Sequence, residues 1–476
     1  MRAAVFCAIG ALGLSACTVG PDFVPPPVAT PDSFGPEPRN VRSRTTEAEP
    51  DPQWWRCFRD GELASLAERL AAQNLDLKTA AERVAQAGAE RVIVASQGLP
   101  HVDVQSMDNY QRVSPNGLPT ALVVPAPGAP LTFSFFQQTI NASWELDLFG
   151  KVRRAVEAQD ATTLAAIENR RGVALMALAE LAQSYIALRG AQTQLAIAER
   201  NLRIAEDDIR LVESRFANGV ATTLDLAQAR GQKENIAETV PPLRQREAQL
   251  INAIGLLLGL EPRALDEELR PPKPPPTTPR LVGVGLPATL LLRRPDIREA
   301  EARLHAALAE IGEAEAEFYP DVNLVGDFGV QSLPLKQLFR ASSTIWSLGP
   351  TVTIPIFQGG RLRGNLALKE SRHPEAAIEF QKALLRAWQE VDDALTAFAQ
   401  AQKRRIAAAR AAAQDKIAFG AAKQRYREGL VDFLNVNESL TQLLRSENEL
   451  VQSDVDVASD LVRLYRALGG GWEIAE

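Results

Sequence analysis

The residues that could do chemistry are few, and they do not form a site. The three histidines, His101, His305 and His373, fall in three different predicted elements, with no metal-ligand spacing between them. Cys57 follows Trp-Trp-Arg, a context typical of a small buried residue rather than a nucleophile. No Gly-x-Ser-x-Gly motif or phosphate loop occurs, and the glycine pattern at residues 283–285 is too short to bind a dinucleotide. The sequence therefore predicts no enzyme activity, no cofactor and no metal.

Charge and composition argue against several other classes of protein. The 476-residue chain has a formal net charge of −7 and a pI near 5.4, without a basic cluster that carries interleaved aromatics, so nucleic acid is not an expected partner. Hydrophobic residues make up 46% and charged residues 23%, as in a folded protein. No apolar run of 18 or more residues follows the N-terminal segment, so no transmembrane helix is predicted.

The N-terminus reads as an export signal. Arg2 precedes an apolar segment, and the sequence Leu-Ser-Ala-Cys ends it at Cys17, which resembles the bacterial lipobox. The alternative is an ordinary signal that happens to end near a cysteine. We expect a signal peptide over 1–16, an acylated Cys17 and a Pro-rich lipidated tether over 17–52. Thr18 is not the Asp that retains many such lipoproteins at the inner membrane, so the outer membrane is favoured.

Two stretches separated by 210 residues have nearly the same pattern. Residues 215–230 and 425–436 each place Arg, an aromatic, two residues and then Gly at the end of a long helical pattern. Gly219 and Gly429 are predicted helix stops, because Gly accepts the left-handed C-cap conformation. The next helices can take their N-caps from Thr222, Thr223 and Asp225, and from Asp432. Each stretch is therefore predicted to be a helix–turn–helix tip.

A long coiled-coil seam leads to the first tip. Large apolar residues recur every seven positions at Leu181, Leu188, Leu195, Leu202, Ile209 and Phe216. A small or apolar partner follows three residues after each of the first five, at Ser184, Ala191, Ala198, Ala205 and Val212. The pattern predicts a helix from about 151 to 218. On its own, it fits a purely structural coiled coil best.

Period-2 stretches predict four strands. They are centred on Val102 and Val104; on Trp144, Leu146 and Leu148; on Val322, Leu324, Phe328 and Val330; and on Trp346, Leu348, Val352, Ile354 and Ile356. With the helices they form two copies of one order, which we divide into a first repeat (53–261), a Pro-rich linker (262–292), a second repeat (293–468) and a C-terminal tail (469–476).

The strands have one apolar and one polar face. This alternation suits a transmembrane β-barrel, although a soluble four-stranded sheet is the alternative. Four strands cannot close a barrel, and lipid does not tolerate open edges, so several chains would be needed. In a barrel, the lumen-facing residues would be Glu145, Asp147, Thr351 and Thr353, and the lipid-facing residues would be Trp144, Leu146, Trp346 and Ile354.

Several short motifs occur in one order along the chain. They are Trp54-Trp55 with Phe58, residues 145–151, Arg293-Arg294-Pro295-Asp296, Phe318-Tyr319-Pro320, Phe357-Gln358-Gly359-Gly360 and the two tips. In this order, with the lipobox, the chain resembles the TolC-like outer-membrane efflux channels, and most closely their lipidated, OprM-like (NodT-type) branch. The resemblance covers nearly the whole mature chain.

The resemblance implies a fold, partners and a location. The fold is mostly α with a transmembrane β-barrel portion: four strands and long coiled-coil helices per chain, and a 12-stranded barrel completed by a homotrimer. The protein would sit in the outer membrane, anchored by lipid, and extend into the periplasm. It would be a passive exit duct for small toxic solutes or drugs, working with a periplasmic adaptor and an inner-membrane pump of the RND type. The alternative is a lipid-anchored structural coiled coil that spans the periplasm.

The resemblance also implies site residues. Adaptor contacts map to Gly219, Val220, Ala221 and Thr222 in the first tip and to Gly429, Leu430 and Val431 in the second. A constriction maps to Asp225, Tyr426, Asn435 and Glu438. The family has an aspartate where this chain has Asn435, and asparagine carries no charge, so the charge of the constriction in the second tip is expected to rest on Glu438 alone. His373-Pro374 is a second departure, because proline kinks or breaks a helix interior.

Overall fold

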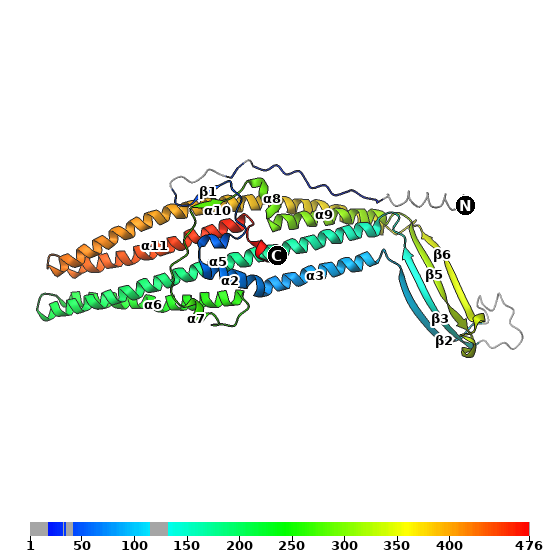
Figure 1. Ribbon diagram of the computed structural model, residues 1–476, viewed down its shortest axis with the longest axis horizontal. Coiled ribbons are helices and arrows are strands. Elements are labelled where there is room, and N and C mark those ends of the chain that lie inside the picture. Colours follow the sequence, from blue (N-terminus) through cyan, green and yellow to red (C-terminus); the bar gives the residue numbers. More distant parts are fainter. Residues whose placement is uncertain (1–17, 32, 35–40, 115–131, 476) are drawn as a thin grey trace. The chain divides into compact units, whose positions relative to one another are not determined.

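The computed structural model describes residues 18–31, 33–34, 41–114 and 132–475, and helices dominate this part of the chain (Figure 1). The helices are α2 (Gly61–Gln73), α3 (Leu75–Ser96), α5 (Lys151–Ala217), α6 (Thr223–Leu257), α7 (Asp266–Leu269), α8 (Leu290–Arg293), α9 (Pro295–Ala316), α10 (Arg361–Arg427) and α11 (Phe433–Ala467). The strands are β1 (Arg44–Thr46), β2 (His101–Arg112), β3 (Thr132–Glu145), β4 (Leu281–Gly283), β5 (Asp321–Ser332) and β6 (Thr344–Thr353). No helix among the described residues is long and apolar enough to cross a membrane.

One order of elements occurs twice. The series α3, β2, β3, α5, α6 is followed later by α9, β5, β6, α10, α11. The matching helices have equal lengths: 22 residues in α3 and α9, 67 in α5 and α10, and 35 in α6 and α11. Helix α10 continues through Pro374, so this proline does not break it.

The chain divides into two compact units. The first, here called the sheet unit, comprises Met1–Pro26, Ala85–Ala165 and Glu301–Glu379. The second, the helical unit, comprises Pro27–Val84, Ala166–Ala300 and Phe380–Glu476. The sheet unit contains β2, β3, β5 and β6, and the helical unit contains both predicted tips.

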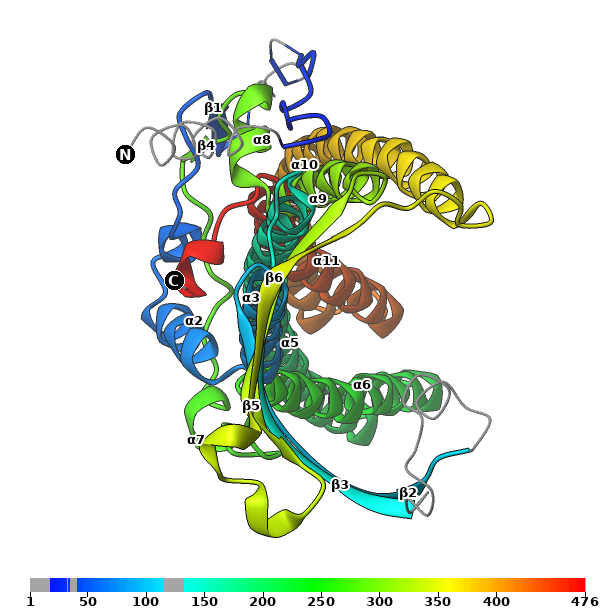
Figure 2. The ribbon, with the colours of Figure 1, turned by 90° about the vertical axis from the view of Figure 1, so that its right-hand side faces the viewer.

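The sheet unit holds one antiparallel sheet with the order β2-β3-β5-β6 (Figures 1 and 2). Two predicted strand ends are wrong. Leu146 and Leu148 follow the end of β3, where the Leu148 N–H donates to Leu146 O at 2.7 Å and turns the chain. Ile354 and Ile356 likewise follow the end of β6. In both places the apolar alternation of the sequence continues beyond the last residue of the strand.

Asp147 therefore does not occupy the predicted lumen-facing strand position. Its carboxylate accepts hydrogen bonds from the Arg153 backbone N–H at 2.9 Å and from Arg153 Nε at 3.2 Å. An acidic side chain satisfies free N–H groups at the start of a helix and favours its dipole. Asp147 thus belongs to the N-terminus of α5 rather than to the sheet.

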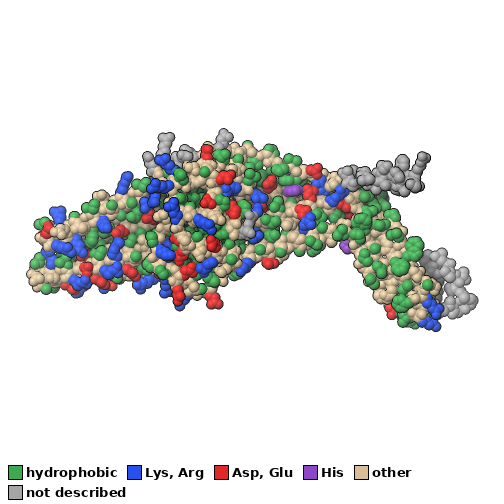
Figure 3. Space-filling view, in the orientation of Figure 1, with side chains coloured by type: hydrophobic (Ala, Val, Ile, Leu, Met, Phe, Trp, Pro, Cys, Tyr) green, Lys and Arg blue, Asp and Glu red, His purple; other side chains and the backbone are tan. Residues whose placement is uncertain are grey.

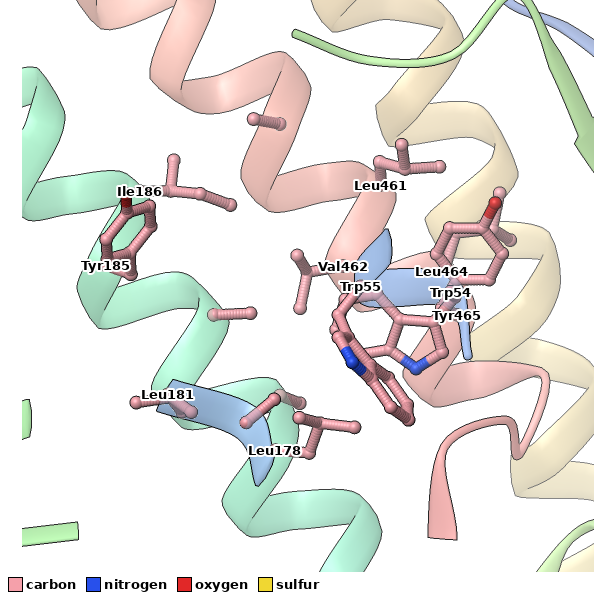
Figure 4. Packing of buried hydrophobic residues seen from close by; sticks show 14 of the residues in the cluster. Trp54, Trp55, Leu178, Leu181, Tyr185, Ile186, Leu461, Val462, Leu464 and Tyr465 are labelled. Carbon is pink, nitrogen blue, oxygen red and sulfur yellow. The ribbon is translucent and has the colours of Figure 1, made fainter. Parts of the chain in front are cut away.

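The core of the helical unit is built around two tryptophans (Figure 4). Trp54 and Trp55 are 0% and 2% exposed, and Trp54 stacks on Tyr465 with ring centroids 5.3 Å apart. The Trp54 indole N–H donates to Gly470 O at 2.9 Å, so the buried polar atom is satisfied. Leu178 and Tyr185 of α5 complete this part of the core.

The coiled-coil seam is buried unevenly. Leu181 and Leu188 are fully buried, but Leu195 is only half-buried and Phe216 is 43% exposed. The small partners are the more completely buried positions toward the tip, with Ala191, Ala198, Ala205 and Val212 all below 7% exposed. Small residues let neighbouring helices approach closely. Toward the tip, the buried helix contacts of this single chain therefore lie at the small positions of the seam rather than at the large ones.

The predicted tether and linker contain ordered structure. Strand β1, within 17–52, pairs in parallel with β4, within 262–292. The fully buried Arg189 of α5 donates to Leu269 O at 3.1 Å and Pro271 O at 3.0 Å, and binds Glu62 at 2.7 Å. Buried peptide carbonyls need donors, and Arg189 supplies them for the start of the Pro-rich segment.

Candidate functional site: the helical tips and the sheet

Both tips turn on a left-handed glycine. Gly219 has φ +69° and Gly429 has φ +76°, which confirms the predicted helix stops after α5 and α10. The Val220 N–H donates to Arg215 O and the Leu430 N–H to Arg425 O, both at 2.9 Å. These bonds close each helix end, a geometry for which Gly is preferred because it carries no Cβ penalty.

The tip turns expose matched apolar residues. Val220 and Leu430 occupy equivalent positions, and each is 63% exposed. The next residues, Ala221 and Val431, are partly buried and pack against the core of the tips. Thr222 is exposed. Each turn therefore exposes an aliphatic side chain directly after its glycine and holds the following residue inward.

The N-caps of the two tips differ. The Thr222 hydroxyl accepts from the Asp225 N–H at 3.2 Å, while the Asp225 carboxylate accepts from the Thr222 N–H at 2.8 Å, which makes a reciprocal capping box. Asp432 occupies the N-cap of α11 without a side-chain capping bond. Asp225, mapped to a constriction, is thus half-buried and engaged in capping, whereas Asn435 and Glu438 are exposed.

One arginine joins the two tips. Arg215, the last basic residue of α5, donates from Nη1 to Tyr426 O at 2.7 Å and to Arg427 O at 3.3 Å. Its guanidinium also lies over the Tyr426 ring, 4.7 Å from the centroid. A cation that hydrogen-bonds the last carbonyls of a helix favours its C-terminal dipole, here that of α10. The sequence showed Arg at both tips, but not that Arg215 would reach across.

Tyr426 is the most buried of the mapped constriction residues. It is 4% exposed, and its ring meets Phe433 edge-on with centroids 5.5 Å apart. The Tyr426 hydroxyl is buried without a hydrogen-bond partner in the described structure. Burial is the largest cause that raises the pKa of Tyr426 above its ordinary value, so the phenol is neutral near pH 7.

A buried ion pair lies near Tyr426. Lys423 Nζ of α10 is 2.6 Å from the Asp208 carboxylate of α5, and Asp208 is 4% exposed. Burial raises the pKa of Asp208 above its usual range, against the opposing effect of the Lys423 ammonium. This pair joins the same two helices as Arg215.

The strand register places apolar residues on one face of the sheet. Trp144, Leu324 and Pro350 are paired across β3, β5 and β6, and so are Ile140, Phe328 and Trp346. Many large members of this face are exposed: Val102, Val104, Ile140, Trp144, Phe328, Trp346, Leu348 and Val352 lie between 39% and 73%. Figure 3 shows hydrophobic side chains gathered over the sheet. We name these residues the apolar face.

The opposite face carries polar side chains. Asn141 donates to Asp103 at 3.1 Å, and Ser347 hydrogen-bonds Asp327. Glu145 is the last residue of β3 and binds Lys151 at 2.9 Å. Thr351 and Thr353 of β6 lie on this face, as the alternation predicted.

The three histidines and Cys57 lie in four different elements. His101 begins β2, His305 lies in α9 and His373 in α10. Within the described ranges, no cluster of three His, Cys, Asp or Glu side chains could hold a metal ion. Cys57 is partly buried, and burial raises the pKa of its thiol to about 12, so the thiol is protonated near neutral pH.

Comparison with known proteins gives one answer. The model of the family described as "Outer membrane efflux protein" matches residues 66–260 and 286–470. The Cation efflux system protein CusC of Escherichia coli O6:H1 is 31% identical, over 97% of each chain. Outer membrane protein OprJ of Pseudomonas aeruginosa is 32% identical, over 97% of this chain and 95% of its own.

Solved structures agree. The outer-membrane channel OprN superposes with a TM-score of 0.87 at 30% identity, over 96% of this chain and 100% of that one. The Campylobacter jejuni CmeC outer membrane channel, 24% identical, shares the fold with a TM-score of 0.87, over 97% and 96%. The fold is that of the TolC-like channels, and the family consists of passive channels, which confirms the expected fold class and the absence of enzyme activity. The chain belongs to the outer membrane efflux protein family.

Proposed function

We propose that this protein is the outer-membrane channel of a tripartite, RND-type efflux system, and that it acts as a homotrimer. The observation that carries the proposal is the exposed apolar face on a sheet whose outer strands, β2 and β6, each pair on only one side in the part of the chain that the structure describes. Lipid accepts such a face but not unpaired strand edges. Three copies of four strands give 3 × 4 = 12, enough to close a water-filled barrel.

The partners follow from the family and the tips. The family forms trimeric outer-membrane channels that work with an adaptor and an inner-membrane pump. We place adaptor contacts at Gly219–Thr222 and Gly429–Val431, where Val220 and Leu430 are uncovered. The constriction would be formed by Asp225, Tyr426, Asn435 and Glu438, with Glu438 as its main exposed charge.

The proposed function also includes a lipid anchor, a duplicated domain organisation and a class of cargo. Cys17 is proposed to be acylated after removal of 1–16, so that the protein is a palmitate-bearing lipoprotein that extends into the periplasm; Cys17 lies outside the described residues. We keep the division into repeats at 53–261 and 293–468, joined by 262–292 and followed by the tail at 469–476, because the element order and helix lengths recur. Small toxic solutes or drugs are the proposed cargo. A structural coiled-coil spacer is disfavoured, because it would not need the apolar face.

The proposal predicts a trimer with a small, rarely open conductance. Protein extracted from outer membranes is measured by native mass spectrometry in detergent and by single-channel recording in planar bilayers. A trimer closes the twelve strands, and joined tips keep the duct shut at rest. A monomer or dimer without conductance would leave the sheet edges unpaired and refute the channel.

The tip glycines provide a second prediction. Gly219→Val and Gly429→Val each put a β-branched side chain at a φ above +65°, where only Gly is readily accommodated. No atom lies within 4 Å of a Cβ added at Gly219, so the strain comes from the backbone alone. We expect each variant to form normal trimers but to bind a periplasmic adaptor at least tenfold more weakly.

Gly231→Val is the matched control for this experiment. Gly231 lies inside α6, where an added Cβ also has open space, and no positive φ is required there. Trimer assembly is followed by native mass, adaptor affinity by surface plasmon resonance and transport by dye accumulation in cells. Normal adaptor binding and efflux in both tip variants would show that these turns are not part of the adaptor-docking site.

A further inference from the structure

The segment after the expected acylation position is docked rather than free. The Val19 N–H donates to Phe149 O at 3.0 Å, at the end of the connection from β3 to α5. Arg154 of α5, with a side chain only 4% exposed, donates to Val19 O at 3.0 Å and to Gly20 O at 2.9 Å. It also pairs with Asp22 at 2.9 Å. All these residues lie in the sheet unit.

Two glycines allow the close approach. Gly20 has φ +93°, and a Cβ added there would overlap Gly312 Cα of α9. A Cβ added at Gly312 would come within 2.9 Å of Arg154 Nε and 3.0 Å of Arg154 Cδ. The segment, α9 and the arginine side chain therefore interlock, and a larger residue at either glycine would push them apart.

A second contact holds the other end of the segment. Phe23 stacks on the His305 ring of α9, with centroids 4.3 Å apart and planes 10° from parallel. His305 Nε2 lies 2.9 Å from Glu157, and Glu157 also binds Arg154 at 2.7 Å. The site thus contains a buried cation, Arg154, which binds the peptide carbonyls and Asp22 of the segment. Glu157 orients this cation, and the His305 ring is an aromatic platform for Phe23.

We propose that Arg154, Gly312 and His305 form a docking site for residues 18–23 that fixes the point from which the lipid anchor leaves the protein. This inference rests on the proposed acylation of Cys17, the residue before Thr18. A Pro-rich tether alone would let the anchor range over many tens of ångströms, because extended chain spans about 3 Å per residue. Docking at Val19 instead keeps the anchor beside the N-terminus of α5, next to the sheet.

Docking of residues 18–23 has a consequence for assembly of the trimer in the membrane. Segments at chain ends are poorly ordered unless they are tied down, and here a buried arginine ties one down. An anchor held beside the sheet delivers the acyl chains and the apolar face to the bilayer together. Arg154 is thus a positioning residue: it acts through the segment that it binds and does not itself meet the lipid.

The test measures the segment and the assembly separately. Hydrogen–deuterium exchange of the N-terminal peptide is recorded on the full protein extracted from outer membranes. We expect Arg154→Ala to accelerate exchange at the Val19 amide at least tenfold, and to lower the yield of folded trimer in the outer membrane several-fold at equal acylation. Arg154→Lys keeps the charge but not the fork of donors, and should give an intermediate result.

Two further variants remove ambiguity. Asp22→Ala removes a partner from the segment side, and since Asp22 is 92% exposed it should not affect folding of the core. In Asp22→Ala, hydrogen–deuterium exchange of the same N-terminal peptide should be faster. Arg91→Ala is the matched control, because Arg91 is an arginine of the same unit that pairs with Asp160 instead, and it should leave the N-terminal peptide unchanged.

The outcomes separate this inference from the proposed function. Unchanged exchange in both Arg154→Ala and Asp22→Ala would overturn the docking site, whatever the state of the channel. Faster exchange with an undiminished trimer yield would overturn the role in anchor placement. The intact mass of the N-terminal peptide reports acylation independently, and conductance reports the channel, so failure of the lipoprotein or channel assignment is visible on its own.

Discussion

Replacement of Leu348 by Arg is expected to remove the folded trimer from the outer membrane. Leu348 is 71% exposed on the apolar face and would meet lipid in the assembled barrel. An arginine on the lipid face of a barrel costs about 2–4 kcal/mol near the bilayer midplane, and a trimer carries it three times. We expect the heat-resistant trimer on semi-native gels of outer-membrane fractions to fall at least tenfold.

Ser347 provides the matched control one residue away. Its side chain lies on the opposite face, where its hydroxyl hydrogen-bonds Asp327. Ser347→Arg introduces the same side chain beside a carboxylate on the polar face, so the trimer should persist. Equal loss of trimer in both variants would show that the strand tolerates no arginine at all. Normal insertion of Leu348→Arg would contradict the lipid-facing assignment of the apolar face.

Replacement of Arg215 by Ala is expected to open the channel more often. The substitution removes the hydrogen bonds to Tyr426 O and Arg427 O and the contact with the Tyr426 ring. A hydrogen bond to a charged group contributes about 1.5–3 kcal/mol, and about 1.4 kcal/mol corresponds to a tenfold change in an equilibrium. If opening separates the two tips, the open fraction should rise roughly tenfold or more in single-channel recordings.

Arg425 is the control for this variant. It holds the corresponding place in the second tip, but its side chain is exposed. Arg425→Ala should therefore leave the open fraction near that of the unmodified channel while removing the same charge from the tips. An unchanged open fraction in Arg215→Ala, with trimer and insertion intact, would mean that the Arg215 contact does not hold the closed state.

Much of the architecture followed from local rules. A glycine at the end of a long helical pattern predicted both tip turns, because the left-handed C-cap depends on the residue itself and on the helix before it. The strand alternation predicted which residues share a face, because successive side chains in a strand point to opposite sides. Two strand ends were predicted wrongly: apolar alternation continued to Leu148 and Ile356, although β3 ends at Glu145 and β6 at Thr353.

The contacts within the candidate sites could not be predicted in this way. Arg215 and Arg425 occupy equivalent positions in similar sequence surroundings, yet of these two side chains only that of Arg215 is seen to reach the carbonyls of the other tip. Asp225 resembles a constriction carboxylate in sequence, but its oxygen accepts from the Thr222 N–H. The reach of Arg215 depends on which side of a helix meets which neighbour, and that is a property of packing between segments some two hundred residues apart. The Asp225 contact is local, and the structure shows that capping occupies the carboxylate that the resemblance assigned to the constriction.

The sequence by itself determined the periodic features: long helices, tip turns, an alternating sheet, and motifs whose order identifies the family. Periodicity fixes these because each rests on backbone geometry over a few residues. Only the tertiary structure decided that the Arg154 side chain is buried against Val19 and Gly20, and that residues 18–23 dock on α9. The physical reason is that a charged side chain is buried only where several distant partners converge on it, and sequence spacing does not record that convergence.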